Sequence, residues 1–125
     1  MERETLRAYM MSLPETAETL PFGPDVWVYK VAGKMFALLP HTGPVRISLK
    51  CDPDEAPLLR ERYPEIEPGY HLNKQHWNTV QCDGALDEAF IEEMIIDSYV
   101  LVVKGVKKAD HERLLRALDR WRSDE

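Results

Sequence analysis

The sequence predicts an α+β fold in which an antiparallel sheet of about five strands carries its helices on one face, in the order α-β-β-β-α-β-β-α-α. Two observations lead to this prediction. Apolar residues recur at helical spacing near both ends of the chain, and the middle of the chain holds β-rich runs separated by turn residues. The 125 residues, 44% of them hydrophobic and 30% charged, are expected to form one domain over residues 1–125.

A first helix is predicted near the start of the chain. Its apolar face would consist of residues spaced three and four apart, namely Leu6, Tyr9, Met10 and Leu13. Pro14 then ends the helix. Residues 26–40 are predicted to form two strands joined at Ala32-Gly33, a connection compatible with a hairpin turn because glycine tolerates positive φ.

A third strand is predicted for residues 45–50, where apolar and polar residues alternate strictly. The alternation sends two sets of side chains to opposite faces, with Val45, Ile47 and Leu49 on one and Arg46, Ser48 and Lys50 on the other. One face of the sheet is therefore expected to be core, and the other to be wet and basic.

A short second helix and a second hairpin follow. Asp52 is placed to cap a helix that opens with Pro53, because proline at the first helical position loses no needed hydrogen bond, and Pro64 closes it. The second hairpin is predicted to have residues 70–72 and 76–81 as its arms, around the turn residues Asn73-Lys74.

Two helices are predicted at the end of the chain, over about residues 86–103 and 108–122, with Gly105 between them as the terminator. The segment SYVLVVKG (98–105) is β-branched and compatible with a strand on propensity alone. A helix is favoured because two adjacent helical rows of apolar residues extend through it, Phe90, Met94 and Leu101 beside Ile91, Ile95 and Val102.

The composition predicts a cytoplasmic protein. Cys51 and Cys82 show no CxxC spacing and no disulfide framework, as expected for a reduced compartment. The charged first ten residues do not resemble a signal peptide, and no stretch of about 18 apolar residues occurs, so no membrane association is expected.

The net charge of −6 is distributed unevenly. Residues 26–50 contain four cations and no carboxylate, whereas residues 52–68 and 83–99 contain six carboxylates each. The last helix carries more cations than carboxylates. The surface is therefore expected to have charged regions of both signs, and a basic region could bind an anionic partner despite the net charge.

Several motifs together carry a family resemblance. These are GYHLNKQHWNTV (69–80), the preceding RYPEIEPGYHL, the early PFG (21–23) and the late DSYVLVVKG. In this order they resemble the MmcQ/YjbR family of small bacterial proteins. The resemblance covers nearly the whole chain and implies a frataxin-like α+β sandwich. It also implies DNA binding through two hairpins that form a double wing.

Enzymatic activity and metal binding are not expected. The chain lacks GxSxG, HExxH, GxGxxG and GxxxxGK[ST] motifs. His71 and His76 lie five apart without further ligands beside them, so neither zinc nor any cofactor is predicted. The acidic series from Asp83 to Asp97 could collect a hard cation or a basic partner protein, but a solvated helix face is the simpler explanation.

The predicted function is that of a non-enzymatic binding module whose partner is DNA, with another protein or a small ligand as the alternative. Oligomeric state and sequence preference are left open. The cations expected to neutralise phosphates are Lys30, Lys34, Arg46, Lys50 and Lys74. The residues expected to stack or to donate hydrogen bonds are Tyr70, His71, Asn73, His76 and Asn78.

Trp77 and Asn78 are neighbours on a strand and therefore point to opposite faces. Whichever of the two points inward, the other is expected to face solvent. The large ring of Trp77 favours the core, and Asn78 is then the better ligand candidate. The sequence alone leaves this choice open.

DNA binding predicts a defined salt dependence. About four phosphate contacts would give log affinity against log salt a slope near −3.6. Lys74→Ala and Arg46→Ala are each expected to flatten this slope by about one unit without lowering the melting temperature, because both positions are predicted to face solvent. Titration of a fluorescent duplex measures the slope. Absence of binding at ~20 mM salt, where weak phosphate contacts are still detectable, would contradict the prediction.

Overall fold

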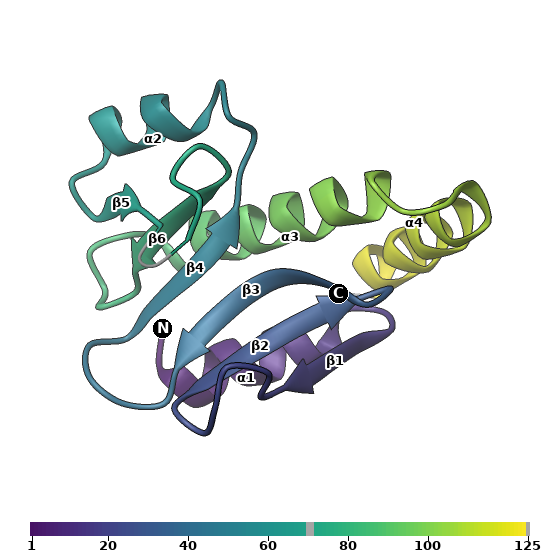
Figure 1. The fold of residues 1–125 in the computed structure, drawn as a ribbon, viewed down its shortest axis with the longest axis horizontal. Coiled ribbons are helices and arrows are strands. Elements are labelled where there is room, and N and C mark those ends of the chain that lie inside the picture. Colours follow the sequence, from purple (N-terminus) through teal and green to yellow (C-terminus); the bar gives the residue numbers. More distant parts are fainter. Residues whose placement is uncertain (70–71, 125) are drawn as a thin grey trace.

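The computed structural model describes residues 1–69 and 72–124, which form a six-stranded antiparallel sheet covered on one face by four helices (Figure 1). The helices are α1 (Arg3–Ser12), α2 (Ala56–Arg62), α3 (Glu88–Lys104) and α4 (Lys108–Ser123). The strands are β1 (Thr16–Thr19), β2 (Val26–Val31), β3 (Lys34–Pro40), β4 (Arg46–Lys50), β5 (Ile66–Pro68) and β6 (Trp77–Gln81). They lie in the order β1-β2-β3-β4-β6-β5. The predicted α+β class is confirmed, with six strands rather than about five.

The additional strand is β1, which pairs with β2 from Thr16 opposite Val31 to Thr19 opposite Val28. Its sequence, TAET, lacks the alternation of apolar and polar residues that identifies a half-buried strand. Glu15 precedes it with a φ of 55°, in the left-handed region. The chain therefore reverses directly from α1 into the edge of the sheet.

The β2–β3 hairpin is confirmed. Ala32 and Gly33 join the strands with φ angles of 50° and 77°. Positive φ at both central residues is the geometry of a two-residue turn whose twist matches that of the flanking strands. Glycine adopts this conformation without steric cost.

The second helix begins later than predicted. Asp52 forms a turn instead of a helix cap: its side chain accepts a hydrogen bond from the Asp54 N–H at 2.8 Å, and its carbonyl accepts one from the Ala56 N–H at 2.9 Å. α2 starts at Ala56, with a second proline, Pro57, in its first turn. The end before Pro64 is confirmed, because α2 stops at Arg62.

The second hairpin also differs from the prediction. On the side away from β4, β6 pairs with β5, whose Ile66 lies opposite Val80. Leu72, the described residue of the predicted first arm, lies outside the strands. The predicted turn at Asn73 is present: its side chain accepts a hydrogen bond from the Gln75 N–H at 2.8 Å, and its carbonyl accepts one from the His76 N–H at 3.2 Å. Tyr70 and His71 lie outside the described residues.

The two final helices are confirmed, including the helical conformation of SYVLVVKG. Tyr99 of α3 is fully buried, with its ring 5.4 Å from that of Phe36 in an edge-to-face arrangement. Its hydroxyl donates to the Pro14 carbonyl at 2.7 Å. Burial raises the pKa of Tyr99 above its ordinary value, so the hydroxyl stays a donor.

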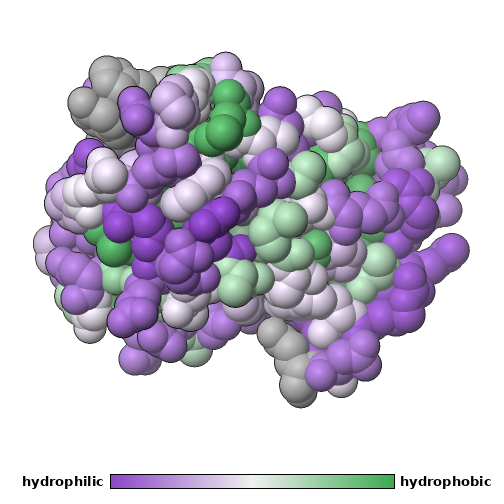
Figure 2. Space-filling model, turned by 90° about the horizontal axis from the view of Figure 1, so that it is seen from below, coloured by the Kyte–Doolittle hydropathy of each residue, from purple (hydrophilic) through white to green (hydrophobic). Residues whose placement is uncertain are grey.

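The main core fills the space between this face of the sheet and the helices. Its fully buried members include Leu6 and Met10 of α1, Ile91 and Ile95 of α3, and Leu114 of α4. The predicted row Ile91, Ile95 and Val102 is therefore buried against the sheet, whereas the row Phe90, Met94 and Leu101 is half-buried. Figure 2 shows the surface of the molecule from below the view of Figure 1, where hydrophobic residues are scattered among hydrophilic ones.

The pairing between β3 and β4 is short, with Ala37 opposite Leu49 and Leu38 opposite Ser48. Ser98 of α3 lies where this pairing ends. Its hydroxyl donates to the Phe36 carbonyl at 2.5 Å and accepts a hydrogen bond from the Lys50 N–H at 2.9 Å. A helix side chain thus satisfies one backbone group on each of the two strands.

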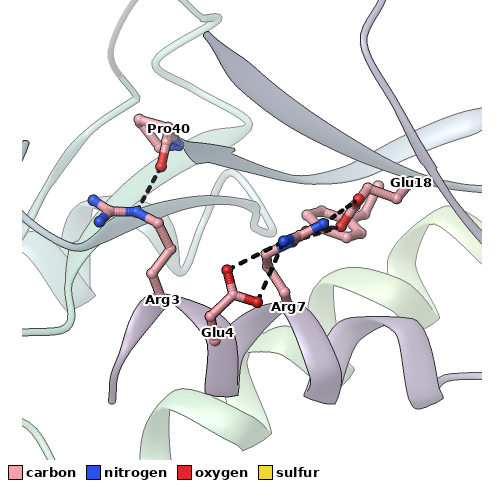
Figure 3. Close-up of polar contacts among 6 residues, drawn as sticks. Arg3, Glu4, Arg7, Glu18 and Pro40 are labelled. Atoms are coloured by element: carbon pink, nitrogen blue, oxygen red, sulfur yellow. Dashed lines mark hydrogen bonds and ion pairs between the residues drawn. The ribbon is translucent and has the colours of Figure 1, made fainter. Parts of the chain in front are cut away.

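An ion pair attaches α1 to the first two strands (Figure 3). Arg7 donates two hydrogen bonds to the carboxylate of Glu18 on β1, at 2.7 and 3.1 Å. Tyr29 on β2 donates its hydroxyl to the same carboxylate at 2.7 Å. The Arg7 guanidinium also lies over the Trp27 ring, 3.9 Å from its centroid. The hydrogen bonds from Arg7 hold the pKa of Glu18 below its ordinary value.

Loss of the Glu18 charge is expected to destabilise the domain. Glu18→Gln should lower the free energy of unfolding by about 1 to 3 kcal/mol at neutral pH, since it removes charge-assisted hydrogen bonds. Because the pKa of Glu18 is lower in the folded state, the wild type should lose this advantage as the pH falls below about 4.3, the ordinary value for Glu. Urea denaturation at several pH values measures the difference.

The matched control is Glu4→Gln. Glu4 also contacts Arg7, at 3.1 Å, but its side chain is 75% exposed. Its removal is expected to leave the denaturation midpoint unchanged. Equal effects of the two variants at neutral pH would contradict the role assigned to Glu18.

Gly69 is expected to tolerate no side chain. A Cβ at this position would lie 2.7 Å from Cβ of Trp77 and 3.0 Å from its carbonyl oxygen. Gly69→Ala should therefore cost about 1 to 3 kcal/mol through overpacking. Gly105→Ala is the control, because its Cβ would come no closer than 3.4 Å to a neighbour, and it should change stability by less than about 1 kcal/mol. Thermal melts that rank the two variants in the opposite order would contradict this interpretation.

Candidate functional site

The face of the sheet that the helices leave uncovered carries a second apolar cluster. Its buried members are Val28 of β2, Leu38 of β3 and Trp77 of β6, and Leu72 packs against them from the loop before β6. This corrects the expectation of a wet and basic face. The predicted alternation within residues 45–50 is present, but the neighbouring strands place apolar side chains on the same face as Arg46, Ser48 and Lys50.

A pocket of about 480 Å³ lies on this face. Paired ends of two strands form one part of it, since Val26 of β2 lies opposite Pro40 of β3. The loop between β1 and β2 contributes Phe22, a residue that is 60% exposed. The described lining residues are Phe22, Val26, Leu38, Pro40, Arg46, Ser48, Leu72 and Thr79.

The polar groups of the lining come from the adjacent strands β4 and β6. Ser48 and Thr79 face each other in register, are both buried, and share a hydrogen bond of 2.9 Å between their hydroxyl oxygens. Arg46 precedes Ser48 by two residues and is the one charged side chain among the described lining residues. The pocket therefore combines apolar walls with a hydroxyl pair and a cation.

The predicted cations do not all share one face. Lys30 lies opposite Met35 and Lys50 opposite Trp77, so both belong to the open face with Arg46. Lys34 instead donates to the Gly105 carbonyl at 3.3 Å, at the turn between α3 and α4.

Lys74 is exposed in the loop before β6, where its carbonyl accepts a hydrogen bond from Arg60 at 2.8 Å. Asn73 is also exposed in this loop. His76 is half-buried, and its carbonyl accepts a hydrogen bond from the Cys51 N–H at 2.8 Å. Of the predicted site residues, Asn73 and Lys74 are thus the ones that this loop exposes in the described part of the chain.

The expectation that either Trp77 or Asn78 faces solvent is wrong. Trp77 is 8% exposed and belongs to the cluster on the open face. Asn78 is 3% exposed on the opposite face, where its side-chain carbonyl accepts a hydrogen bond from Arg60 at 3.0 Å. Its amide also donates to the Ala56 carbonyl of α2 at 3.4 Å. Both faces of the sheet are covered here, so neither residue is free for solvent.

Of the pocket residues, the sequence pointed to Arg46 and, through the PFG segment, to Phe22. One signal was present. The strands VWVYKV and KMFALLP are apolar at consecutive positions, and such runs are typical of strands covered on both faces. The contribution of Ser48 and Thr79 could not be detected in this way, because their meeting depends on the pairing of β4 with β6.

Neither thiol has features of a reactive group. Cys51 and Cys82 are both free, and burial raises the pKa of each to about 11, so both stay protonated at neutral pH. Within residues 1–69 and 72–124, no group of three or more His, Cys, Asp or Glu side chains is placed to hold a metal ion. Over the same residues, no helix combines the length and apolar character needed to span a membrane.

Comparison with known proteins identifies similar chains. A 40% identical relative is the uncharacterized protein YbdF of Escherichia coli O157:H7, with 89% of this chain and 92% of that protein aligned. The uncharacterized protein YjbR of Escherichia coli K12 is 33% identical, over 75% of this chain and 80% of its own.

Solved structures of similar sequence have the same fold as this chain. The crystal structure of the Deinococcus radiodurans protein DR2400, a DUF419 domain, is 42% identical and superimposes with a TM-score of 0.82, over 89% of this chain and 86% of that one. A Pseudomonas syringae crystal structure is 32% identical with a TM-score of 0.72, over 81% of this chain and 98% of its own. The YjbR family model matches residues 11–101, and the chain therefore belongs to the YjbR family.

Proposed function

We propose that the chain is a non-enzymatic binding module that holds a small, mainly apolar molecule in the pocket of the open sheet face. The observation that carries this proposal is the pocket itself. Its volume of about 480 Å³ falls within the range of ligand sites, and apolar walls with a few polar groups are their usual composition. Small-ligand binding was one of the alternatives that the sequence left open.

The lining chemistry favours binding over catalysis. The described lining residues include no His, Cys or carboxylate side chain. Catalysis by proton transfer requires a group that titrates near the working pH, and an arginine or a hydroxyl pair without a base does not supply one. The pocket can therefore hold and orient a molecule, but its described residues contain no acid-base pair.

Duplex DNA is the second candidate, because Lys30, Arg46 and Lys50 share the open face. The same face buries Val28, Leu38 and Trp77 and carries the pocket, which Leu38 also lines. Phosphate groups gain nothing from apolar walls, and binding to a duplex would also work against the net charge of −6. These features favour the small ligand.

A substitution that fills the pocket with a larger side chain is expected to weaken the binding of small molecules there. Fragments identified by their effect on amide resonances of the wild type should perturb residues of β2, β3, β4 and β6 that surround the pocket. Val26→Phe places a ring in this space and should weaken such fragments by about tenfold or more, which corresponds to at least ~1.4 kcal/mol. Titration followed by amide chemical shifts measures the affinities.

The control is Leu58→Phe, an equally hydrophobic change at a 63% exposed position of α2 away from the pocket. It should leave fragment affinity unchanged. Fragments that bind Val26→Phe as tightly as the wild type, or that perturb only residues outside the pocket, would contradict the proposed function.

A further inference from the structure

We propose that the ligand of this pocket is an amphipathic monocarboxylate, whose apolar body lies between the pocket walls and whose carboxylate pairs with Arg46. This inference rests on the proposed function, and it adds the chemical class of the ligand. It follows from three properties of the lining: its apolar area, its charge and the placement of its hydroxyls.

The apolar walls of the pocket favour a ligand with an apolar body. Phe22, Val26 and Pro40 stand on one side, from the loop before β2 and the paired ends of β2 and β3. Leu72 contributes from the loop before β6, and Leu38 connects the pocket to the second cluster. A molecule seated here removes apolar surface of its own and of these walls from water, which supplies its affinity. A fully polar ligand such as a sugar would gain little from this contact.

The charge of the ligand is set by Arg46. It is half-buried, and it contributes the one formal charge among the described lining residues. Next to apolar walls, where the effective dielectric is lower than in water, an ion pair is stronger than on an open surface. The planar guanidinium offers paired N–H donors that match the two oxygens of a carboxylate.

An apolar lining favours a ligand of low charge. A phosphate monoester carries up to two charges near neutral pH, and burial of an uncompensated charge against apolar walls is costly. A monocarboxylate carries one charge, so it brings less charge against the apolar walls than a phosphate monoester does. The choice of carboxylate over phosphate therefore follows from the apolar character of the lining.

The hydroxyl pair gives the head group a second set of polar contacts. Ser48 lies two residues from Arg46 on the same face of β4, about 7 Å along the strand, and Thr79 lies beside it on β6. Hydroxyls both donate and accept hydrogen bonds, so they can orient a polar group whose main partner is the guanidinium. The polar side of the pocket is therefore the β4–β6 side.

The test compares octanoate with octanamide, which share a chain and differ in charge. Isothermal titration or amide shifts should show that the wild type binds octanoate at least about tenfold more tightly than octanamide, an advantage that shrinks with added salt. Arg46→Gln should bind both probes equally. Arg116→Gln, the same change at an exposed position of α4, should keep the wild-type preference.

The outcomes separate the two proposals. Octanamide binding in the pocket as tightly as octanoate, with no effect of Arg46→Gln, would overturn the carboxylate class and leave the proposed function standing. Binding of neither probe, together with a fragment screen without hits in the pocket, would overturn both. If Arg46→Gln does not fold, Arg46→Lys replaces it. This variant keeps the positive charge but lacks the paired N–H donors of the guanidinium, so it should keep a reduced preference for octanoate.

Discussion

The central strands of this sheet have two apolar faces, and the four helices of the described chain cover only one of them. Strands β2 and β3 send Tyr29 and Leu39 toward the helices, and Val28 and Leu38 away from them. Exposure of the second set to water would be unfavourable, so Trp77 and Leu72 pack over it. The pocket forms beside this cover, at the Val26 and Pro40 end of the same strands. The pocket thus exists because the central strands have more apolar surface than the helices cover.

On the helix side, an ion pair attaches α1 to the edge strand β1. Arg7 and Glu18 are both half-buried, and neither would be stable there alone. Their two hydrogen bonds, the hydroxyl of Tyr29 and the ring of Trp27 compensate the lost hydration. This network also explains why β1 can form with a sequence as polar as TAET, since Glu18 contributes an interaction in place of apolar burial.

The sequence predicted the features that depend on local chemistry. The turn at Ala32-Gly33 and the helix through SYVLVVKG follow from glycine geometry and from helical rows of apolar residues, and both are present. The predicted start of α2 was wrong because the Asp52 side chain can accept a backbone hydrogen bond in a turn as well as at the start of a helix. The burial of Asn78 and the meeting of Ser48 with Thr79 were beyond prediction, because they require knowing that α2 covers β6 and that β6 lies beside β4.

The short pairing between β3 and β4 divides the sheet into two three-stranded halves, β1-β2-β3 and β4-β6-β5, with α3 packed across both (Figure 1). The pocket straddles this seam: Val26, Leu38 and Pro40 belong to the first half, and the remaining strand residues of its lining belong to the second. A small change in twist between the halves would alter the width of the pocket while leaving each half intact. Ser98, which forms hydrogen bonds with β3 and β4 where their pairing ends, ties the two halves together at that point.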